Sequence, residues 1–334
     1  MVQEKLENKI MISCPICGIA QKEENYIETY FFNFNNQEYK LYHCQNCDLQ
    51  WWEPRKILPE FYEKEGDEGY KARHLGIFEE IGENHKLFFK LMPIKSGKLL
   101  DVGCGDGVFL KEAKKFGFEV WGIDLDRKSI KVCQEKWKLK NTFAVTHEEF
   151  ANFCHKERLK FDIITFFEVL EHQDKPKEFL ETIKSMLKPN GYIVLSVPNR
   201  ESLLNRKLYR ELLYSTDNPP HHFLRFSKNT LENIFRKLGF EEILICQTPV
   251  KISDAILYLQ MTITSPKVNK ILRKTIVGSE IAGEGTTLYK ESSIAIKITF
   301  KMLKEIRNML LLLPALIIKV KTEGINLYFQ GRLK

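Results

Sequence analysis

The sequence predicts an α/β protein with a mostly parallel sheet, a small cysteine-rich module before it and a C-terminal α/β extension after it. From Lys98 to about Cys246, short apolar stretches alternate with segments of helix length, which is typical of parallel strands joined by crossover helices. Two CxxC pairs stand apart from this pattern, near the N-terminus. The 334 residues exceed the roughly 150 that are typical of one domain, so more than one unit is expected.

Composition excludes several classes of protein. Apolar residues make up 43% of the chain and charged residues 28%, as in globular proteins, which excludes disordered and fibrous classes. Residues 265–334 hold 13 basic and 5 acidic side chains and so account for the net charge of +7, leaving residues 1–264 close to neutral. We therefore do not expect nucleic acid as the partner. Residues 1–10 lack the apolar stretch of a signal peptide, and the cysteine usage favours a reducing, cytoplasmic location.

The expected elements follow one another along four stretches. Residues 10–55 form the cysteine-rich module, in which alternation from Tyr26 to Tyr42 around Asn35-Asn36 predicts a β-hairpin. Residues 56–97 form a helical, acidic connector, residues 98–246 the core, and residues 247–334 the extension. In the core, strands are predicted at Lys98–Val102, Glu119–Ile123, Thr142–Val145, Asp162–Phe166 and Tyr192–Val197. Helices are predicted at Val108–Phe116, Lys128–Lys138, Lys177–Leu187 and Lys228–Leu238, with a last helical run near Phe300–Val320.

The cysteine pairs predict a zinc-ribbon-like site. A two-residue gap lets two thiolates bind one ion from a tight turn, and four such ligands complete a closed, structural Zn²⁺ site. The predicted hairpin fills the 26 residues between the pairs and brings them together. The alternative is four free thiols in a cytosolic protein. The expected ligands are Cys14, Cys17, Cys44 and Cys47.

A glycine-rich loop, DVGCGDG at 101–107, follows the first predicted core strand and opens a helix. Glycines allow a sharp turn and close approach of a ligand, and the helix start offers unpaired N–H groups. The spacing is GxGxG rather than the GxGxxG of nicotinamide-binding proteins. Asp101 would repel a pyrophosphate but attract an ammonium group, so the expected ligand is an amino acid joined to a nucleoside. A general Rossmann-like nucleotide binder is the alternative.

The second strand ends in Gly122-Ile123-Asp124, about 20 residues after the loop, where a carboxylate can accept both ribose hydroxyls. Further landmarks follow in order, FDII through VLEH at 161–172 and LKPNGYIVLSVPN at 187–199. With these motifs the chain resembles the class I S-adenosylmethionine-dependent methyltransferases over about 150 residues. The resemblance implies that Asp101, Gly103 and Gly105 contact the methionine part of S-adenosylmethionine and Asp124 its ribose. Residues 146–148 stand where the family often has an acid near the adenine amine. The expected cofactor set is Asp101, Gly103, Cys104, Gly105, Gly107, Asp124, Leu125, Thr146, His147 and Glu168.

Three histidines follow the fourth and fifth strands, at the edge where ligands bind in open α/β sheets. His172 follows the fourth strand and serves either as a base or as a loop-holding hydrogen-bond partner. His221 and His222 stand between Pro219-Pro220 and a helix cap at Ser227, as a base-bearing loop or a structural turn. Histidine titrates near neutral pH and can take a proton from a hydroxyl. We expect His222 to be the base, with His221 and His172 as further candidates.

The same loop resembles the EHxxYFS segment of the zinc-containing sugar C-methyltransferases, whose histidine acts as base. On that alignment His222 matches the histidine, whereas His221 replaces the glutamate and Arg225 the tyrosine. The resemblance therefore leaves methylation of a sugar carbon as an alternative reaction.

The C-terminal stretch contains an apolar run, 309–318, of ten residues. A membrane span needs about 20 residues, so this run cannot cross a bilayer. Apolar surface beside Lys319 and Lys321 favours peripheral contact with an anionic membrane through residues 299–321, at the inner face of the membrane. A dimer contact or a lid on the core is the alternative.

These patterns favour a cytoplasmic S-adenosylmethionine-dependent methyltransferase that acts on a hydroxyl of a small molecule, a glycan or a lipid-linked precursor. A zinc-ribbon RNA methyltransferase is the alternative from another substrate class, because aromatic residues of the module could stack on bases. The near-neutral first 264 residues disfavour it.

Overall fold

The structure, a computed structural model, describes residues 12–33, 35–56, 75, 77, 79–202, 218–253, 255–256, 259, 302, 307–317 and 324–334. The chain separates into two compact units. The first comprises Met1–Arg200, Asp217–Thr248 and Asn326–Lys334, and the second comprises Glu201–Thr216 and Pro249–Ile325. Residues 57–74 of the expected connector lie outside the described residues, as does most of the expected C-terminal extension.

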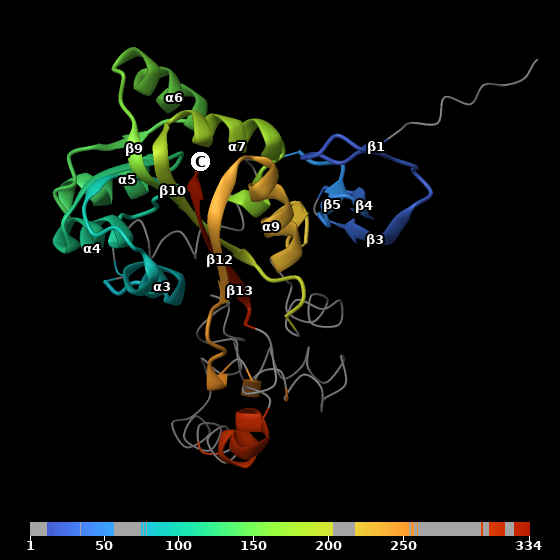
Figure 1. Cartoon of the computed structure of the whole chain (residues 1–334). Helices are drawn as coiled ribbons and strands as arrows, with labels where there is room; N and C mark the ends of the chain where they lie inside the picture. Colours follow the sequence, from blue (N-terminus) through green and yellow to red (C-terminus); the bar gives the residue numbers. More distant parts are fainter. Residues whose placement is uncertain are drawn as a thin grey trace, which may run out of the picture. The chain divides into compact units, whose positions relative to one another are not determined.

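The first unit is built on a seven-stranded sheet with the order β12-β13-β10-β9-β6-β7-β8 (Figure 1). The strands from β10 to β8 are parallel, whereas β13 runs antiparallel to both of its neighbours. Apart from this inserted strand, the order is that of a Rossmann-like sheet, which confirms the predicted fold class. The strands are β6 (Gly97–Val102), β7 (Phe118–Asp124), β8 (Thr142–Ala144), β9 (Phe161–Phe167), β10 (Leu187–Pro198), β12 (Phe240–Gln247) and β13 (Asn326–Leu333).

Helices cover both faces of this sheet, because successive strand residues point to opposite sides and both sides are apolar. Leu99 and Leu100 of β6 are fully buried but belong to two different hydrophobic clusters, and so do Tyr328 and Phe329 of β13. One cluster includes α3 (Glu83–Leu91), α4 (Val108–Phe116) and α5 (Arg127–Glu135). The other includes α6 (His147–Lys156), α7 (Pro176–Ser185) and α9 (Lys228–Lys237).

Each strand and helix predicted between Lys98 and Leu238 is present, with ends shifted by up to five residues. The sequence analysis placed no helix at α6 and no strand at β12 or β13. Residues 326–334 were expected in the C-terminal extension, whereas β13 lies between β10 and β12 in the core sheet. The chain thus leaves the sheet after β12 and returns to it as β13, after the second unit.

The N-terminal module contains the predicted hairpin, formed by β3 (Tyr26–Phe32) and β4 (Gln37–His43) with Tyr30 opposite Tyr39. Two short strands, β1 (Ile12–Ser13) and β2 (Ala20–Gln21), pair with each other. The hairpin continues into β5 (Gln50–Glu53), and β5 pairs with β11 (Leu224–Arg225), which follows the histidine loop. Module and core therefore share one four-stranded sheet, β11-β5-β4-β3.

In the second unit, residues 307–317 are helical, within the run predicted near Phe300–Val320. Met309, Leu310 and Leu313 of this helix are each at least 68% exposed. Among the described residues, no helix is both long enough and apolar enough to cross a membrane.

Candidate functional site

The glycine loop joins β6 to α4 and adopts a backbone that favours glycine. Gly103, Gly105 and Gly107 have φ angles of 77°, 51° and 80°. A Cβ on Gly103 would lie 2.6 Å from Cγ2 of Val169, which follows β9. The N–H groups of Gly103 and Cys104 both donate to the carbonyl of Ile123, at 2.8 and 3.1 Å. The loop is thus held between the carboxyl ends of β7 and β9, where ligands bind in sheets of this kind.

Asp101 lies at the end of β6 and is 3% exposed. The Thr165 hydroxyl donates to its Oδ1 at 2.6 Å. Burial raises the pKa of Asp101 to about 7, and the nearby Asp124 carboxylate adds to the increase. A buried carboxyl with a raised pKa is poised to receive a cationic group, because a positive charge would restore the ionised form.

Asp124 ends β7, and backbone N–H groups hold its carboxylate. Gly105 N–H donates to Oδ2 and Asp126 N–H to Oδ1, each at 2.8 Å. Leu125, the next residue, is 73% exposed. The two predicted residues after β8 have structural contacts: Thr146 caps α6 in a capping box with Glu149, and the His147 ring lies 4.9 Å from that of Phe179. Burial lowers the pKa of His147.

Glu168 directly follows β9 and has a left-handed backbone, with φ of 55°. Its Oε1 accepts hydrogen bonds from Ser196 of β10 at 2.6 Å, Asn84 of α3 at 3.2 Å and Asn326 of β13 at 3.1 Å. Burial raises the pKa of Glu168. The sequence analysis missed Asn84, Ser196 and Asn326. Only Ser196 carried a signal, because it stands near the end of a predicted strand.

The three predicted histidines are brought together. Their ring centroids lie 4.6–4.7 Å apart, and one ring nitrogen from each lies within 4.8 Å of the others. His172 lies in a short 3-10 helix, η1 (Leu170–His172), and its Nδ1 lies 2.7 Å from the carbonyl oxygen of His221. This is the loop-holding hydrogen bond of the structural alternative. Burial, with the two neighbouring histidines, holds the pKa of His172 well below its usual value.

Glu171 adds a fully buried carboxylate to this cluster. Its Oε1 lies 3.9 Å from Nε2 of His172 and 4.0 Å from Nε2 of His222. The cluster is also next to the cofactor loop, because Val169, which Gly103 approaches, belongs to the same turn after β9. His222 is buried, whereas His172 and His221 are partly exposed.

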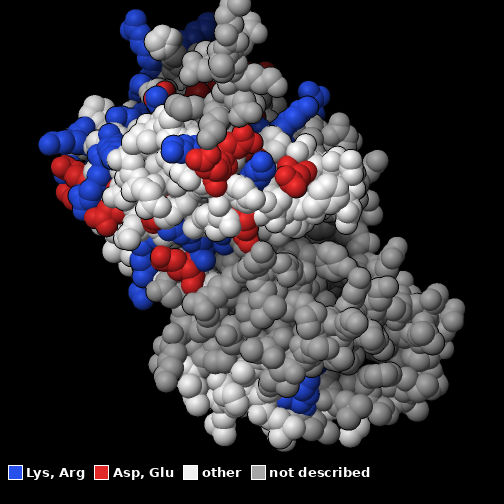
Figure 2. Space-filling view, turned by 90° about the vertical axis from the view of Figure 1, so that its right-hand side faces the viewer, with Lys and Arg blue, Asp and Glu red and all other residues white. Residues whose placement is uncertain are grey.

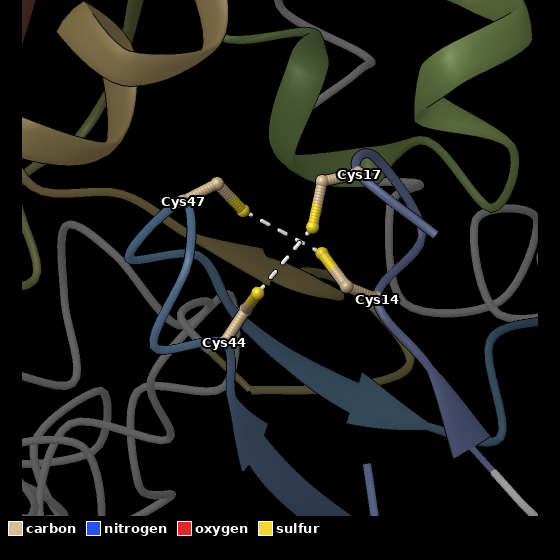
Figure 3. A group of neighbouring side chains, drawn as sticks. All are labelled: Cys14, Cys17, Cys44 and Cys47. Carbon is tan, nitrogen blue, oxygen red and sulfur yellow. Dashed lines mark hydrogen bonds between the residues drawn. The ribbon is translucent and has the colours of Figure 1, made fainter. Parts of the chain in front are cut away.

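The four predicted cysteines also converge, with their Sγ atoms turned toward a common centre (Figure 3). Sγ of Cys14 lies 3.6 Å from Sγ of Cys47, and Sγ of Cys17 lies 3.4 Å from Sγ of Cys44. A disulfide would require about 2.05 Å, whereas thiolates about 2.3 Å from one tetrahedral ion lie about 3.8 Å apart. The thiol of Cys47 lowers the pKa of Cys14 to about 5. The donor set and spacing fit one Zn²⁺.

Both cysteine turns have the same backbone design. The N–H groups of Gly18 and Asp48 donate to the carbonyls of Cys14 and Cys44, at 2.9 and 2.8 Å. Gly18 and Asp48 both have positive φ angles, 74° and 63°. Because a left-handed backbone favours glycine and tolerates aspartate, the second turn can carry a side chain at this position.

That side chain, Asp48, connects the module to the core. Its carboxylate accepts hydrogen bonds from Arg200 at 2.6 Å and from Ser227, the residue that caps α9. His43 lies 2.8 Å from the same carboxylate, and Thr230 donates to the Asp48 carbonyl. Burial alone would raise the pKa of Asp48, but the hydrogen bonds from Arg200, Ser227 and His43 lower it to about 2.

The module also holds the histidine loop directly. Trp52 N–H donates to the carbonyl of Phe223 at 2.9 Å, and Phe223 N–H donates to the carbonyl of Glu171. One chain of backbone hydrogen bonds thus runs from the cysteine module through Phe223, which follows His222, to the turn that carries His172.

Comparisons with known proteins identify the family of the domain that carries this site. A family model described as "Methyltransferase domain" matches residues 73–245, just over half of the chain. The ubiquinone biosynthesis O-methyltransferase of Pelagibacter ubique (strain HTCC1062) is 31% identical over 157 residues, which cover 45% of this chain and 60% of that protein. The protein of the same name from Paraburkholderia phymatum is 33% identical over 105 residues, 31% of this chain and 45% of that protein.

The match with each of these two relatives thus spans less than two thirds of the relative's length. Among solved structures, the SAM-dependent methyltransferase from Archaeoglobus fulgidus is similar at 20% identity and a TM-score of 0.46. That similarity covers 81% of this chain and 99% of the other.

Proposed function

The chain belongs to the methyltransferase-domain family and is an S-adenosylmethionine-dependent methyltransferase. From this premise we propose that it methylates a hydroxyl group of a small molecule. The observation that carries the proposal is the histidine cluster next to the glycine loop, because methylation of a hydroxyl requires removal of its proton. The two relatives described above are named O-methyltransferases, which supports a hydroxyl acceptor.

The proposed cofactor contacts follow from the strand ends. The bound cofactor supplies an electrophilic methyl group on a sulfonium. Asp101 receives the ammonium of its methionine part, and the loop that contains Gly103, Cys104, Gly105 and Gly107 lets the backbone approach that part closely. The Asp124 carboxylate, which two backbone N–H groups hold in place, accepts the ribose hydroxyls. We assign the exposed Leu125, which directly follows Asp124, to the same cofactor pocket.

The other predicted cofactor residues are assigned supporting roles rather than direct contacts with the cofactor. Glu168 joins the carboxyl ends of β9 and β10 to the amino end of β13, beside the proposed methionine site. Thr146 and His147 lie where the adenine edge is expected, but their side chains already cap and pack α6. We assign them to the wall of the adenine pocket rather than to direct recognition.

The acceptor hydroxyl loses its proton beside the cluster of His172, His221 and His222. The acceptor oxygen then forms a bond to the methyl carbon while the carbon–sulfur bond breaks and its electron pair stays on sulfur. The task of the chain is to hold oxygen, methyl carbon and sulfur in line. Methylation of a sugar carbon or of RNA remains an alternative outcome. On the face drawn in Figure 2, basic and acidic side chains are interspersed, which supports a small molecule more than RNA.

The test supplies the full-length protein with methyl-labelled S-adenosylmethionine and a cell extract, and then separates labelled RNA, lipid and small molecules. We expect label in an ether of a small molecule or of a lipid-linked precursor. The Asp124→Ala variant should abolish labelling, and the His155→Gln variant, changed at an exposed histidine of α6, should preserve it. Label in RNA alone would overturn the proposed substrate class.

We further propose that Cys14, Cys17, Cys44 and Cys47 hold one structural Zn²⁺. Zinc supplies no chemistry in a closed four-thiolate site, so its contribution is to the folding of the module. The purified protein should contain zinc at this site by elemental analysis, and the Cys44→Ser variant should lose it. Free, readily alkylated thiols at all four positions in the purified protein would contradict the assignment.

We also propose that residues 307–317 contact an anionic membrane surface, in a protein of the cytoplasm, which brings the enzyme to a lipid-linked acceptor. Exposed Met309, Leu310 and Leu313, with Lys319 and Lys321 next in sequence, support this. The Leu310→Glu/Leu313→Glu variant should lose binding to anionic vesicles in a sedimentation assay. Unchanged sedimentation would favour a protein contact instead. Removing residues 299–334 would not be a fair test, because it deletes β13 from the sheet.

A further inference from the structure

The three clustered histidines are suited to bind a metal ion as well as to act as a base. Three imidazoles from two separate loops place one ring nitrogen each within 4.8 Å of the others. Around an ion with bonds of about 2.1 Å, neighbouring nitrogens lie about 3.4 Å apart. Small rotations of the three rings would therefore close the cluster on one ion.

The hydrogen bond of His172 fixes which of its nitrogens can bind. Because Nδ1 lies 2.7 Å from the carbonyl oxygen of His221, Nδ1 carries the hydrogen and Nε2 presents its lone pair. Metal-ligating histidines characteristically donate their other N–H to a backbone carbonyl or carboxylate in this way. The lone pair of His172 is thus oriented by the backbone of the loop that carries His221 and His222.

Glu171 places a negative charge beside these nitrogens. Its fully buried carboxylate lies 3.9 and 4.0 Å from Nε2 of His172 and His222, beyond hydrogen-bond range for either nitrogen. At this distance the carboxylate adds a negative charge close to both imidazole nitrogens, which favours a cation bound to them.

We propose that His172, His221 and His222 bind a divalent first-row transition-metal ion, with the Glu171 carboxylate as the adjacent negative charge. Three imidazoles favour such ions over Mg²⁺ or Ca²⁺, which prefer oxygen ligands. Because His172 and His221 are partly exposed, one side of the ion stays open, as in catalytic rather than structural sites. The site is separate from the four cysteines.

The use of this ion rests on the proposed function. An acceptor hydroxyl bound at the open position becomes more acidic, and its proton leaves to water before the oxygen attacks the methyl carbon. The base role expected of His222 then falls away, because the nitrogen that would take the proton binds the ion instead.

The test uses full-length protein whose cysteine site is first filled with Zn²⁺ and then titrates Co²⁺. Because Zn²⁺ holds the thiolates more tightly than Co²⁺, added Co²⁺ reports on other sites. We expect one Co²⁺ per chain, visible as d–d absorption without a thiolate-to-cobalt charge-transfer band. His172→Ala and His222→Ala should each weaken Co²⁺ binding about tenfold or more, and Glu171→Gln should weaken it as well. His155→Ala, at an exposed histidine outside the cluster, should leave it unchanged.

Calorimetry with S-adenosylhomocysteine on the same variants separates loss of the metal site from loss of the fold. We expect each folded variant to keep its cofactor affinity while losing Co²⁺. No Co²⁺ absorption in the wild type, equal affinity in the His172→Ala/His222→Ala variant, or charge-transfer absorption alone would each overturn the metal site. None of these measurements depends on methyl transfer. They therefore test the metal site alone, whereas the labelling experiment tests the proposed function.

Discussion

Burial favours the protonated form of Asp101, whereas the proposed cofactor contact favours the ionised form, so the ionisation of Asp101 can be followed through cofactor binding. Burial raises its pKa to about 7, so the cofactor-free protein holds it partly protonated near neutral pH. The proposed contact with the ammonium of the cofactor requires the ionised form. We expect the dissociation constant of S-adenosylhomocysteine to be constant above pH 7 and to rise up to about tenfold per pH unit below it. Calorimetry between about pH 5.5 and 8.5, on both sides of that pKa, measures this dependence of the dissociation constant on pH.

The Asp101→Asn variant provides the control. It should bind the cofactor more weakly and without this pH dependence. Because the folded-state pKa lies above the unfolded value, the contribution of Asp101 to stability without cofactor is fully present below about pH 4 and is lost as pH rises to about 7. The variant should remove that slope from the thermal unfolding profile. An unchanged pH dependence of binding in the variant would show that another group titrates.

Gly103 supplies a second test at the scale of one residue. Its φ of 77° and the 2.6 Å that would separate an added Cβ from Val169 predict that Gly103→Ala distorts both the loop and the turn after β9. We expect cofactor affinity to fall at least about tenfold, since strain of about 1–3 kcal/mol must be relieved by moving the loop. Gly82→Ala is the matched control, because Gly82 has a φ of −71° and open space around it. Equal effects in calorimetry would contradict the argument.

The sequence predicted the positions of those candidate residues that depend on local geometry. Glycines at a turn with positive φ and acids at strand ends are visible as motifs, and Asp101, Gly103 and Asp124 lie where the motifs indicate. Asn84 and Asn326 were not predictable, and Ser196 carried only its place near a strand end, because the three residues meet at Glu168 only after α3, β10 and β13 have packed. Contacts between distant segments leave no spacing pattern in the chain.

At the scale of elements, one turn contributes a charged contact between the module and the core. Asp48 joins the second cysteine turn to Arg200 and to the start of α9. We expect Asp48→Asn to cost about 2–3 kcal/mol of unfolding free energy, because it leaves the largely buried Arg200 without its charge partner. Urea unfolding at pH 7 measures this. Glu38→Gln, at an exposed acid of β4, should change stability by less than about 0.5 kcal/mol.

The same residue predicts the acid behaviour of the module. The folded-state pKa of Asp48, about 2, lies below its ordinary value of 3.8, so its stabilisation is present above about pH 4 and is lost as pH falls toward 2. The difference between wild type and Asp48→Asn should therefore shrink below pH 4. A difference that stays constant to pH 2 would assign the effect to packing rather than to charge.

The helices and strands that the sequence predicted are those with a clear periodicity of apolar residues or a recognisable helix N-cap. Ser227 was predicted as a helix cap and is one. The α6 helix was missed although Thr146 and Glu149 form a capping box, because the sequence places the same stretch beside the expected adenine site. β13 was missed for another reason. Its Leu327, Tyr328 and Phe329 are buried on both faces, and such a short apolar run can belong to a strand or a helix.

At the scale of the whole molecule, the two proposed metal sites should be coupled. The cysteine module pairs through β5 with β11 and donates from Trp52 to the residue after His222. We expect removal of zinc, by chelation or by Cys44→Ser, to weaken Co²⁺ binding at the histidines by about tenfold or more, since ligand positions then lose their support. Cofactor affinity should change less, because the glycine loop contacts β7 and β9 instead. Loss of both affinities to the same extent would indicate global unfolding.

Translation gives the position of β13 a further consequence. Both β10 and β12 leave the ribosome long before residue 326 is made, and each must pair with a strand that does not yet exist. Until then the nascent chain presents two apolar, unpaired strand edges, which invite pairing with other chains. Newly made protein should thus need protection by chaperones until β13 has left the ribosome.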